Sequence, residues 1–228
     1  MSKLAEGELR WVGHRLDPDF KQIRFIIISD THYGNPLFAE SYFNRTIEFI
    51  KASPDVYCML NGDICESALK TSKGEVYKQV GSPQDQRDWA IEHLMPIKDK
   101  ILGVTTGNHE ARIWNDCGVD ISKDIASALG APYRAEGMML KIMLGQGNER
   151  HANKPYVFWA YITHGYGGAR TKAAKAVKAE RVAAWMPSCD LIAMSHDHVV
   201  NIAPDVAFHP DPRGTVDKET GFLTGAIT

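Results

Sequence analysis

Short apolar runs constrain this chain more than any other feature, because each is too short for a helix and stops at polar residues. In the first half they lie at 23–29, 56–60 and 101–106. Their β-branched residues indicate buried strands. The stretches between them, 38–52 and 84–98, have helical character. This alternation of strands and helices predicts a parallel sheet that is covered by helices.

The second half of the chain has a different pattern. Apolar runs at 138–144 and 156–163 flank a polar, glycine-containing stretch, which predicts a hairpin. Further strands are expected at 191–194 and 221–228, and the Ala-, Lys- and Glu-rich stretch 171–186 favours a helix. The two halves together predict an α/β fold with two sheets, at least one of them mixed, and helices outside.

Composition excludes several classes of protein. The 228 residues carry 26 basic and 28 acidic side chains, so no overall field attracts nucleic acid or an anionic membrane. No apolar run approaches the roughly 18 residues of a membrane span, and the first residues lack a signal-peptide core. Four cysteines without a CxxC pair indicate reduced thiols. We expect one cytoplasmic domain, 1–228, and, since the chain stops in an apolar segment, a natural protein that continues past Thr228.

The polar residues after the apolar runs repeat one theme. They are Asp30-Thr31-His32, Gly62-Asp63, Gly107-Asn108-His109-Glu110, Thr163-His164-Gly165 and Ser195-His196-Asp197-His198. In open α/β sheets the carboxyl ends of strands form binding sites, so these five groups can converge on one cleft. Residues two apart in an extended chain point the same way, so Asp30 should pair with His32, and His196 with His198.

These groups supply seven candidate metal ligands: Asp30, His32, Asp63, Asn108, His164, His196 and His198. Seven ligands are too many for one tetrahedral zinc ion. If Asp63 bridges two metals, each metal receives four protein ligands. Imidazole and oxygen ligands without thiolate suit manganese, our first choice, or iron, zinc or nickel. Two such metals at about 3.5–4 Å share a hydroxide for in-line attack at phosphorus and neutralise phosphate charge.

The order of these motifs closely resembles that of the calcineurin-like metallophosphoesterases. The resemblance spans Asp30 to His198, most of the chain. It implies a four-layer α/β/β/α sandwich of two mixed β-sheets flanked by helices, with a dinuclear metal site at the carboxyl edge of the strands. Two positions depart from the family pattern. Ser195 stands where the family usually has glycine, and Glu66 stands where it often has aspartate.

The resemblance also implies a role for each site residue. The first metal would be held by Asp30, His32 and His198, together with the bridging Asp63. The second metal would be held by Asn108, His164 and His196, again with Asp63. His109 would contact substrate and protonate the leaving oxygen, which suits a side chain whose ordinary pKa of about 6.5 lies near working pH. The catalytic residues would thus be His109, Asp63 and Asn108.

Three basic residues are candidates for binding the substrate. Arg112 follows His109 and either grips a phosphate or pairs with an acidic neighbour. Arg170 and Lys172 follow the glycine-rich stretch 165–168, where bare backbone and a helix N-terminus favour an anion. The alternative is a flexible loop before a helix with a solvated basic face. A similar glycine-rich stretch occurs in phage and prophage members of the family.

We therefore predict a metal-dependent phosphoester hydrolase, either a phosphatase or a phosphodiesterase, that acts on a phosphorylated small molecule or a nucleotide. A nuclease or DNA phosphodiesterase of the same family is one alternative. A non-catalytic interaction scaffold is an alternative of a different class, which the complete set of ligands disfavours. No membrane partner is expected. The sequence leaves open the physiological substrate, the native metals and the oligomeric state.

Overall fold

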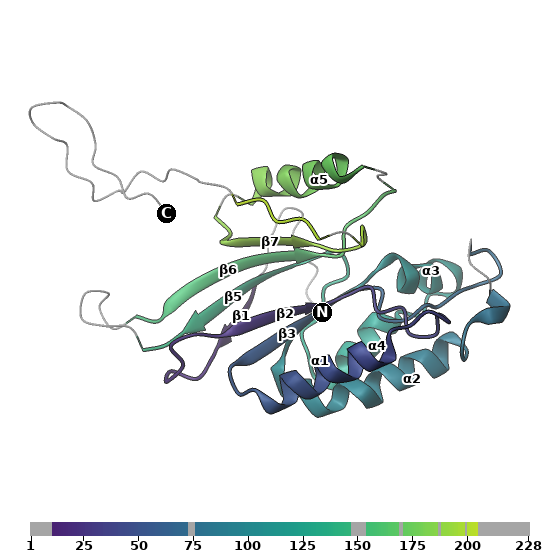
Figure 1. The fold of residues 1–228 in the computed structure, drawn as a ribbon, viewed down its shortest axis with the longest axis horizontal. Helices are drawn as coiled ribbons and strands as arrows, with labels where there is room; N and C mark the ends of the chain where they lie inside the picture. The colour runs from purple at the N-terminus through teal and green to yellow at the C-terminus, as the bar shows by residue number, and fades with distance from the viewer. Residues whose placement is uncertain are drawn as a thin grey trace, which may run out of the picture.

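The strands of a computed structural model form two sheets (Figure 1). The described residues are 11–72, 76–146, 154–168, 171–186, 188–198 and 200–204. The three-stranded sheet has the order β2-β3-β4 and contains β2 (Arg24–Ile28), β3 (Val56–Asn61) and β4 (Ile101–Thr105). The four-stranded sheet has the order β1-β5-β6-β7 and contains β1 (Trp11–Arg15), β5 (Met138–Leu144), β6 (Tyr156–Thr163) and β7 (Leu191–Met194).

The three-stranded sheet is parallel throughout, as the alternation of strands and helices predicts. The expectation of two mixed sheets is therefore wrong for this sheet in the part of the chain described. Its strands are joined by helical crossovers, and a crossover returns the chain in the same direction. The four-stranded sheet is mixed, because β5 and β6 form the predicted hairpin while β1 and β7 pair in parallel with them. The strand expected at 221–228 lies outside the described residues.

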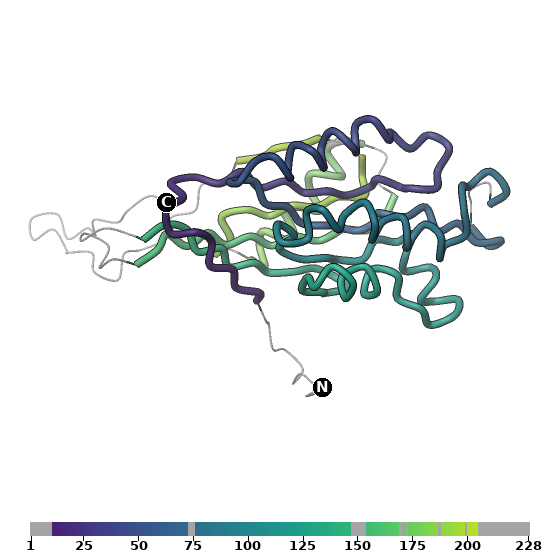
Figure 2. Tube along the Cα trace, turned by 90° about the horizontal axis from the view of Figure 1, so that it is seen from below, coloured from purple at the N-terminus to yellow at the C-terminus, as the bar shows by residue number. Residues whose placement is uncertain are grey.

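Helices cover the parallel sheet on the face away from the other sheet (Figure 1). The helices are α1 (Glu40–Ala52), α2 (Pro83–Leu94), α3 (Asn108–Cys117), α4 (Ile121–Leu129) and α5 (Lys172–Trp185), with short 3₁₀ turns at Val76–Lys78 and Met95–Lys100. Figure 2 shows α1, α2 and α4 side by side across the parallel sheet, whereas α5 contacts β7 of the four-stranded sheet. No helix in the described ranges is long and apolar enough to cross a membrane.

Two hydrophobic cores lie on opposite faces of the parallel sheet. Cys58 and Leu60 of β3 belong to the core under the helices, and the intervening Met59 belongs to the core between the sheets. Leu140 and Ile162 meet Met59 from the four-stranded sheet, and all five side chains are fully buried. Burial on both faces explains why β3 is a continuous apolar run.

Local signals explain both boundaries of α2. Ser82 and Asp85 form a reciprocal capping box that starts α2, with Pro83 in the first turn. The α-helix ends at Leu94, short of the expected residue 98, and a 3₁₀ turn that includes Pro96 continues to Lys100. The sequence analysis did not predict β1, α3 or α4.

Candidate metal centre

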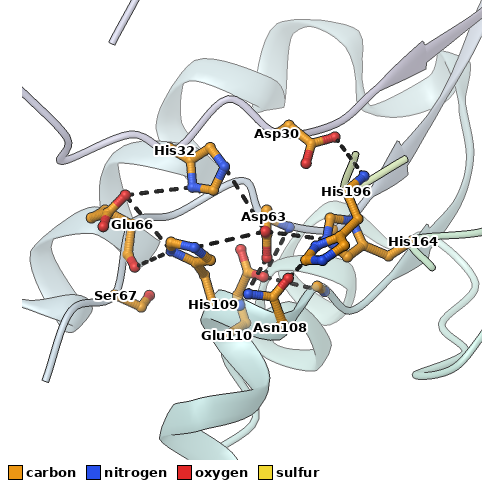
Figure 3. Close-up of polar contacts among 12 residues, drawn as sticks. Asp30, His32, Asp63, Glu66, Ser67, Asn108, His109, Glu110, His164 and His196 are labelled. Atoms are coloured by element: carbon orange, nitrogen blue, oxygen red, sulfur yellow. Dashed lines mark hydrogen bonds and ion pairs between the residues drawn. The ribbon is translucent and has the colours of Figure 1, made fainter. Parts of the chain in front are cut away.

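Side chains from the ends of β2, β3, β4, β6 and β7 face one another at one edge of the two sheets (Figure 3). They include all seven candidate ligands: Asp30, His32, Asp63, Asn108, His164, His196 and His198. The first ligand group is Asp30, His32 and His198, and the second ligand group is Asp63, His164 and His196. Within each group the donor atoms lie within 4.8 Å of one another.

Buried atoms that make no hydrogen bond mark the first ligand group. Asp30 Oδ1 lies 3.1 Å from His198 Nε2, which is within the distance of an ion pair. That oxygen and both ring nitrogens of His32 are buried and make no hydrogen bond. Buried polar atoms in folded proteins nearly always have a partner, and a cation bound between these atoms would supply one. The donor set therefore fits a metal ion.

The second ligand group lies against the first through Asp63. Asp63 Oδ2 is 3.1 Å from His164 Nε2 and 3.9 Å from His32 Nε2, so it stands between the two groups. Asn108 Oδ1 lies 3.3 Å from the same His164 nitrogen. The position of the Asp63 carboxylate between the two groups would allow two metals to share it. His196 Nε2 lies 2.8 Å from the carbonyl oxygen of Gly167, which can only accept, so Nδ1 is the unprotonated ring nitrogen when His196 is neutral.

The backbone at the site is left-handed, not extended. Five of the candidate ligands have positive φ angles: Asp30 (54°), His32 (50°), Asp63 (50°), His196 (73°) and His198 (49°). Asp30 and His32 lie together as expected, but the extended backbone that was expected to pair them is wrong. The expected pairing of His196 with His198 is also wrong, because their donor atoms belong to different ligand groups. Left-handed residues other than glycine cost about 1–3 kcal/mol each and persist where the surroundings hold them, which is common at functional sites.

Glu110 holds the backbone around Asp63. Its carboxylate is fully buried and accepts hydrogen bonds from the backbone N–H groups of Asp63 (3.0 Å), Cys65 (2.9 Å) and Gly107 (3.3 Å). Burial raises the pKa of Glu110, and the charge of Asp63 raises it further. Burial would also raise the pKa of Asp63, but His164 and His109 together outweigh burial and lower that pKa. The sequence analysis placed Glu110 in the motif without giving it this role.

Two glycines allow the ends of β3 and β4 to approach each other. A Cβ atom on Gly62, whose φ is +76°, would lie 2.4 Å from the backbone nitrogen of Gly107. A Cβ atom on Gly107 would lie 2.1 Å from Asp63 Oδ1. The glycines of the Gly62-Asp63 and Gly107-Asn108 motifs are thus required by close packing at the site.

His109 is oriented by the loop that follows Asp63. Its Nδ1 lies 2.7 Å from the carbonyl oxygen of Glu66, so Nδ1 carries the donated proton and Nε2 is directed toward the site, 3.9 Å from Asp63 Oδ2. Burial lowers the pKa of His109, and the charge of Asp63 opposes that shift. The ring lies 4.3 Å from that of His32. Donation from Nε2 requires the doubly protonated ring, which the lowered pKa disfavours, so the general-acid role stays a prediction.

Glu66, one of the two departures from the family pattern, lies at the site. Its Oε2 is 3.4 Å from His32 Nδ1 and accepts a hydrogen bond from Asn35 Nδ2 at 3.2 Å. Burial would lower the pKa of His32, but Glu66, Asp63 and Asp30 together raise it. The carboxylates at this edge therefore stabilise positive charge, which is what a cation site needs.

The basic substrate-binding candidates have different outcomes. Arg112 Nη1 donates a hydrogen bond to Ser72 Oγ at 2.9 Å, and among the described residues it forms no ion pair with an acidic neighbour. Arg170 lies outside the described residues, and only the backbone of Lys172, the first residue of α5, is described. Neither of these two predictions is tested.

The basic face of α5 is not simply solvated, contrary to the alternative interpretation of this segment. Lys178 Nζ lies 3.0 Å from Asp197 Oδ2 and donates to the carbonyl oxygen of Tyr166 at 2.7 Å. Lys175 Nζ donates to the carbonyl oxygen of Asp197 at 2.6 Å. Asp197 separates His196 from His198, so α5 holds the 195–198 loop through these two lysines. The sequence analysis did not predict the contact between these lysines and Asp197, because the spacing of lysines along a helix does not indicate which residue they bind.

Residues 23–200 match the family model described as Metallophos, calcineurin-like phosphoesterase. No curated protein matches the chain. The matched range contains every candidate ligand, from Asp30 to His198.

Proposed function

The chain belongs to the calcineurin-like phosphoesterase family, and from that premise we propose that it hydrolyses phosphoesters with two divalent metals. The observation that carries the proposal is the arrangement of the two ligand groups around Asp63. Its Oδ2 atom lies within 3.9 Å of a histidine nitrogen from each group. The family and the clusters of histidine and acidic residues both support divalent metal binding.

Each metal would have its own set of protein ligands. The first would be held by Asp30, His32 and His198, and the second by Asn108, His164 and His196, with Asp63 shared. Nitrogen and oxygen donors without thiolate suit manganese, and iron, zinc or nickel as alternatives. When bound, the metals supply Lewis acidity, which activates water for attack at phosphorus and neutralises charge on the phosphoryl oxygens.

The residues of the chain itself position the substrate and move a proton. In its doubly protonated form His109 would donate the proton on Nε2 to the leaving oxygen, while the carbonyl oxygen of Glu66 keeps the proton on Nδ1 in place. The side chain of Asn108 would contact a phosphoryl oxygen beside His164. Arg112 stays a candidate for binding a more distant phosphate oxygen. Arg170 and Lys172 remain candidates for the same task.

The substrate class is proposed as a phosphorylated small molecule or a nucleotide or nucleic-acid phosphodiester. We also propose that the two sheets and their outer helices form the four-layer sandwich of the family, as one domain. A cytoplasmic setting is supported by four free cysteines. Of these, Cys58 is buried, and burial raises the pKa of its thiol to about 12, so it stays unreactive.

Reconstitution of the metal-free protein tests the proposed function. The protein is loaded with manganese and assayed with p-nitrophenyl phosphate, bis-p-nitrophenyl phosphate, mononucleotides, cyclic nucleotides and single-stranded DNA. We expect metal-dependent hydrolysis of at least one of them, which Asp63→Asn abolishes and Glu92→Gln, on the exposed side of α2, leaves unchanged. Absence of metal-dependent hydrolysis across this set would contradict the proposal.

A further inference from the structure

A buried amide at the end of β3 joins the two sheets beside the ligand groups. Asn61 is fully buried. Its Nδ2 donates to the carbonyl oxygen of Thr163 at 2.9 Å and to Ser195 Oγ at 2.7 Å. Its Oδ1 accepts from Thr105 Oγ1 at 2.7 Å. Both amide protons and the amide oxygen therefore have partners.

The partners of this amide come from three other strand ends. Thr105 ends β4 in the parallel sheet, Thr163 ends β6 in the four-stranded sheet, and Ser195 follows β7. Thr163 directly precedes His164, and Ser195 directly precedes His196. The side chain of Asn61 thus holds the ends of β6 and β7, directly before the ligands His164 and His196.

The backbone of Asn61 acts on the same ligands. Its carbonyl oxygen accepts a hydrogen bond from His164 Nδ1 at 2.7 Å. This contact leaves His164 Nε2 free to face Asp63 and Asn108. Ser29 Oγ, next to Asp30, also lies 2.8 Å from this oxygen. Asn61 therefore touches the neighbours of both ligand groups without being a ligand itself.

Ser195 accounts for the second departure from the family pattern. It is not among the described residues with positive φ, whereas the next residue, His196, is. The position therefore does not need glycine for its backbone. A glycine here would remove the acceptor of one amide proton of the fully buried Asn61, and an unpaired buried donor is unfavourable. Asn61 and Ser195 thus act as a pair.

We propose that Asn61 is a positioning residue that, through Ser195, holds the 195–198 loop against the parallel sheet and so keeps the two ligand groups at the spacing that metals need. This inference rests on the proposed function, because it assumes that the two groups bind metal. A purely structural role would be different, since the bond would then stabilise the sheets without affecting metal affinity.

Metal binding and stability, measured separately, distinguish the two roles. The variants are Ser195→Ala, Ser195→Thr, Asn61→Leu and the double variant Asn61→Leu/Ser195→Ala. The matched control is Ser122→Ala, a buried serine in α4 outside the site. Manganese affinity is measured by calorimetric titration, and thermal unfolding is followed on the metal-free proteins.

We expect manganese affinity to fall because residues that orient metal ligands typically contribute 10–100-fold to it. Asn61→Leu should lose affinity within that range, and Ser195→Ala about tenfold. Ser195→Thr keeps the hydroxyl group and should keep the affinity. The double variant should bind no more weakly than Asn61→Leu alone, since both changes remove the same bond. Ser122→Ala should change only stability.

Three results would overturn the inference: wild-type affinity in Ser195→Ala, additive losses in the double variant, or lower thermal stability with unchanged manganese affinity. If Asn61→Leu does not fold, the comparison of Ser195→Ala with Ser195→Thr decides. Wild-type protein that binds no manganese would contradict the proposed function, and the inference with it. Wild-type binding with unaffected variants would contradict the inference alone.

Discussion

The two regions that carry the ligands are held in different ways. The parallel sheet buries its contribution: Asp63 is 1% exposed, and Glu110 holds the surrounding backbone through three N–H groups. The 195–198 loop is open, and the side chain of His198 is 60% exposed. It is held by side chains from elsewhere, Asn61 and Lys178. The buried region therefore depends on contacts within its own motifs, and the open region depends on residues outside them.

His109 gives the largest expected effect, and it tests the buried region for chemistry rather than metal binding. His109→Gln should keep its metals but lose about 10²–10⁴-fold in kcat, the usual contribution of general acid catalysis. The loss should shrink for nitrophenyl esters, whose leaving groups need little protonation. The measurement is kcat for alkyl and nitrophenyl esters, with His93→Gln in α2 as control. Equal losses for both ester types would remove the general-acid role.

Glu110 tests whether the buried region depends on one carboxylate. Glu110→Ala leaves three backbone N–H groups without their acceptor, and we expect the free energy of unfolding to fall by about 3 kcal/mol. Urea unfolding of the metal-free protein measures this, with the exposed Glu92→Ala as control. A change below that of Glu92→Ala would show that the region is held by other contacts.

Lys178 tests the open region. Lys178→Met removes the ion pair with Asp197 and the bond to the carbonyl oxygen of Tyr166. We expect manganese affinity to fall about tenfold, because the 195–198 loop loses a support, and Lys178→Arg to recover part of it. The control is Lys123→Met on the exposed side of α4. Unchanged affinity in Lys178→Met would mean that α5 does not position the loop.

His14 gives the smallest effect and concerns the junction of the sheets away from the ligands. Its Nε2 lies 2.7 Å from the carbonyl oxygen of Leu102, and burial lowers its pKa. In the unfolded chain His14 has its ordinary pKa of about 6.5 and therefore binds more protons than in the folded protein. The stability that the neutral His14 contributes is thus fully present above that pH and is lost as pH falls toward the folded pKa. His14→Gln should flatten the pH dependence of unfolding between pH 7 and 5. An identical slope in the variant would contradict this.

The same contrast explains what the sequence could predict. The ligands were found because each follows an apolar strand, and the carboxyl ends of strands meet at one edge. Asn61 and Lys178 were not assigned roles, because their partners Ser195 and Asp197 are far away in the sequence. The left-handed backbone at the ligands was not predicted either, since it is imposed by packing and not by residue type.

The missed elements have similar causes. β1 is a short edge strand in which exposed and half-buried residues alternate, so it lacks the continuous apolar run of a buried strand. The start of α3 lies inside the Gly107-Asn108-His109-Glu110 motif, whose residues were interpreted as site residues and not as the first turn of a helix. Tertiary pairing defines β1. In contrast, α3 has local signals that the sequence analysis did not use, namely the bond from the Gly107 N–H to Glu110 and the left-handed Gly118 at its end.

Titration of metal-free protein with manganese tests the central claim most directly. The two ligand groups around Asp63 predict binding that approaches two equivalents per chain in the wild-type protein. Asp63→Ala should fall well below that value, because it removes the ligand that both metals share. A wild-type stoichiometry of one, with no second weaker site, would contradict the account.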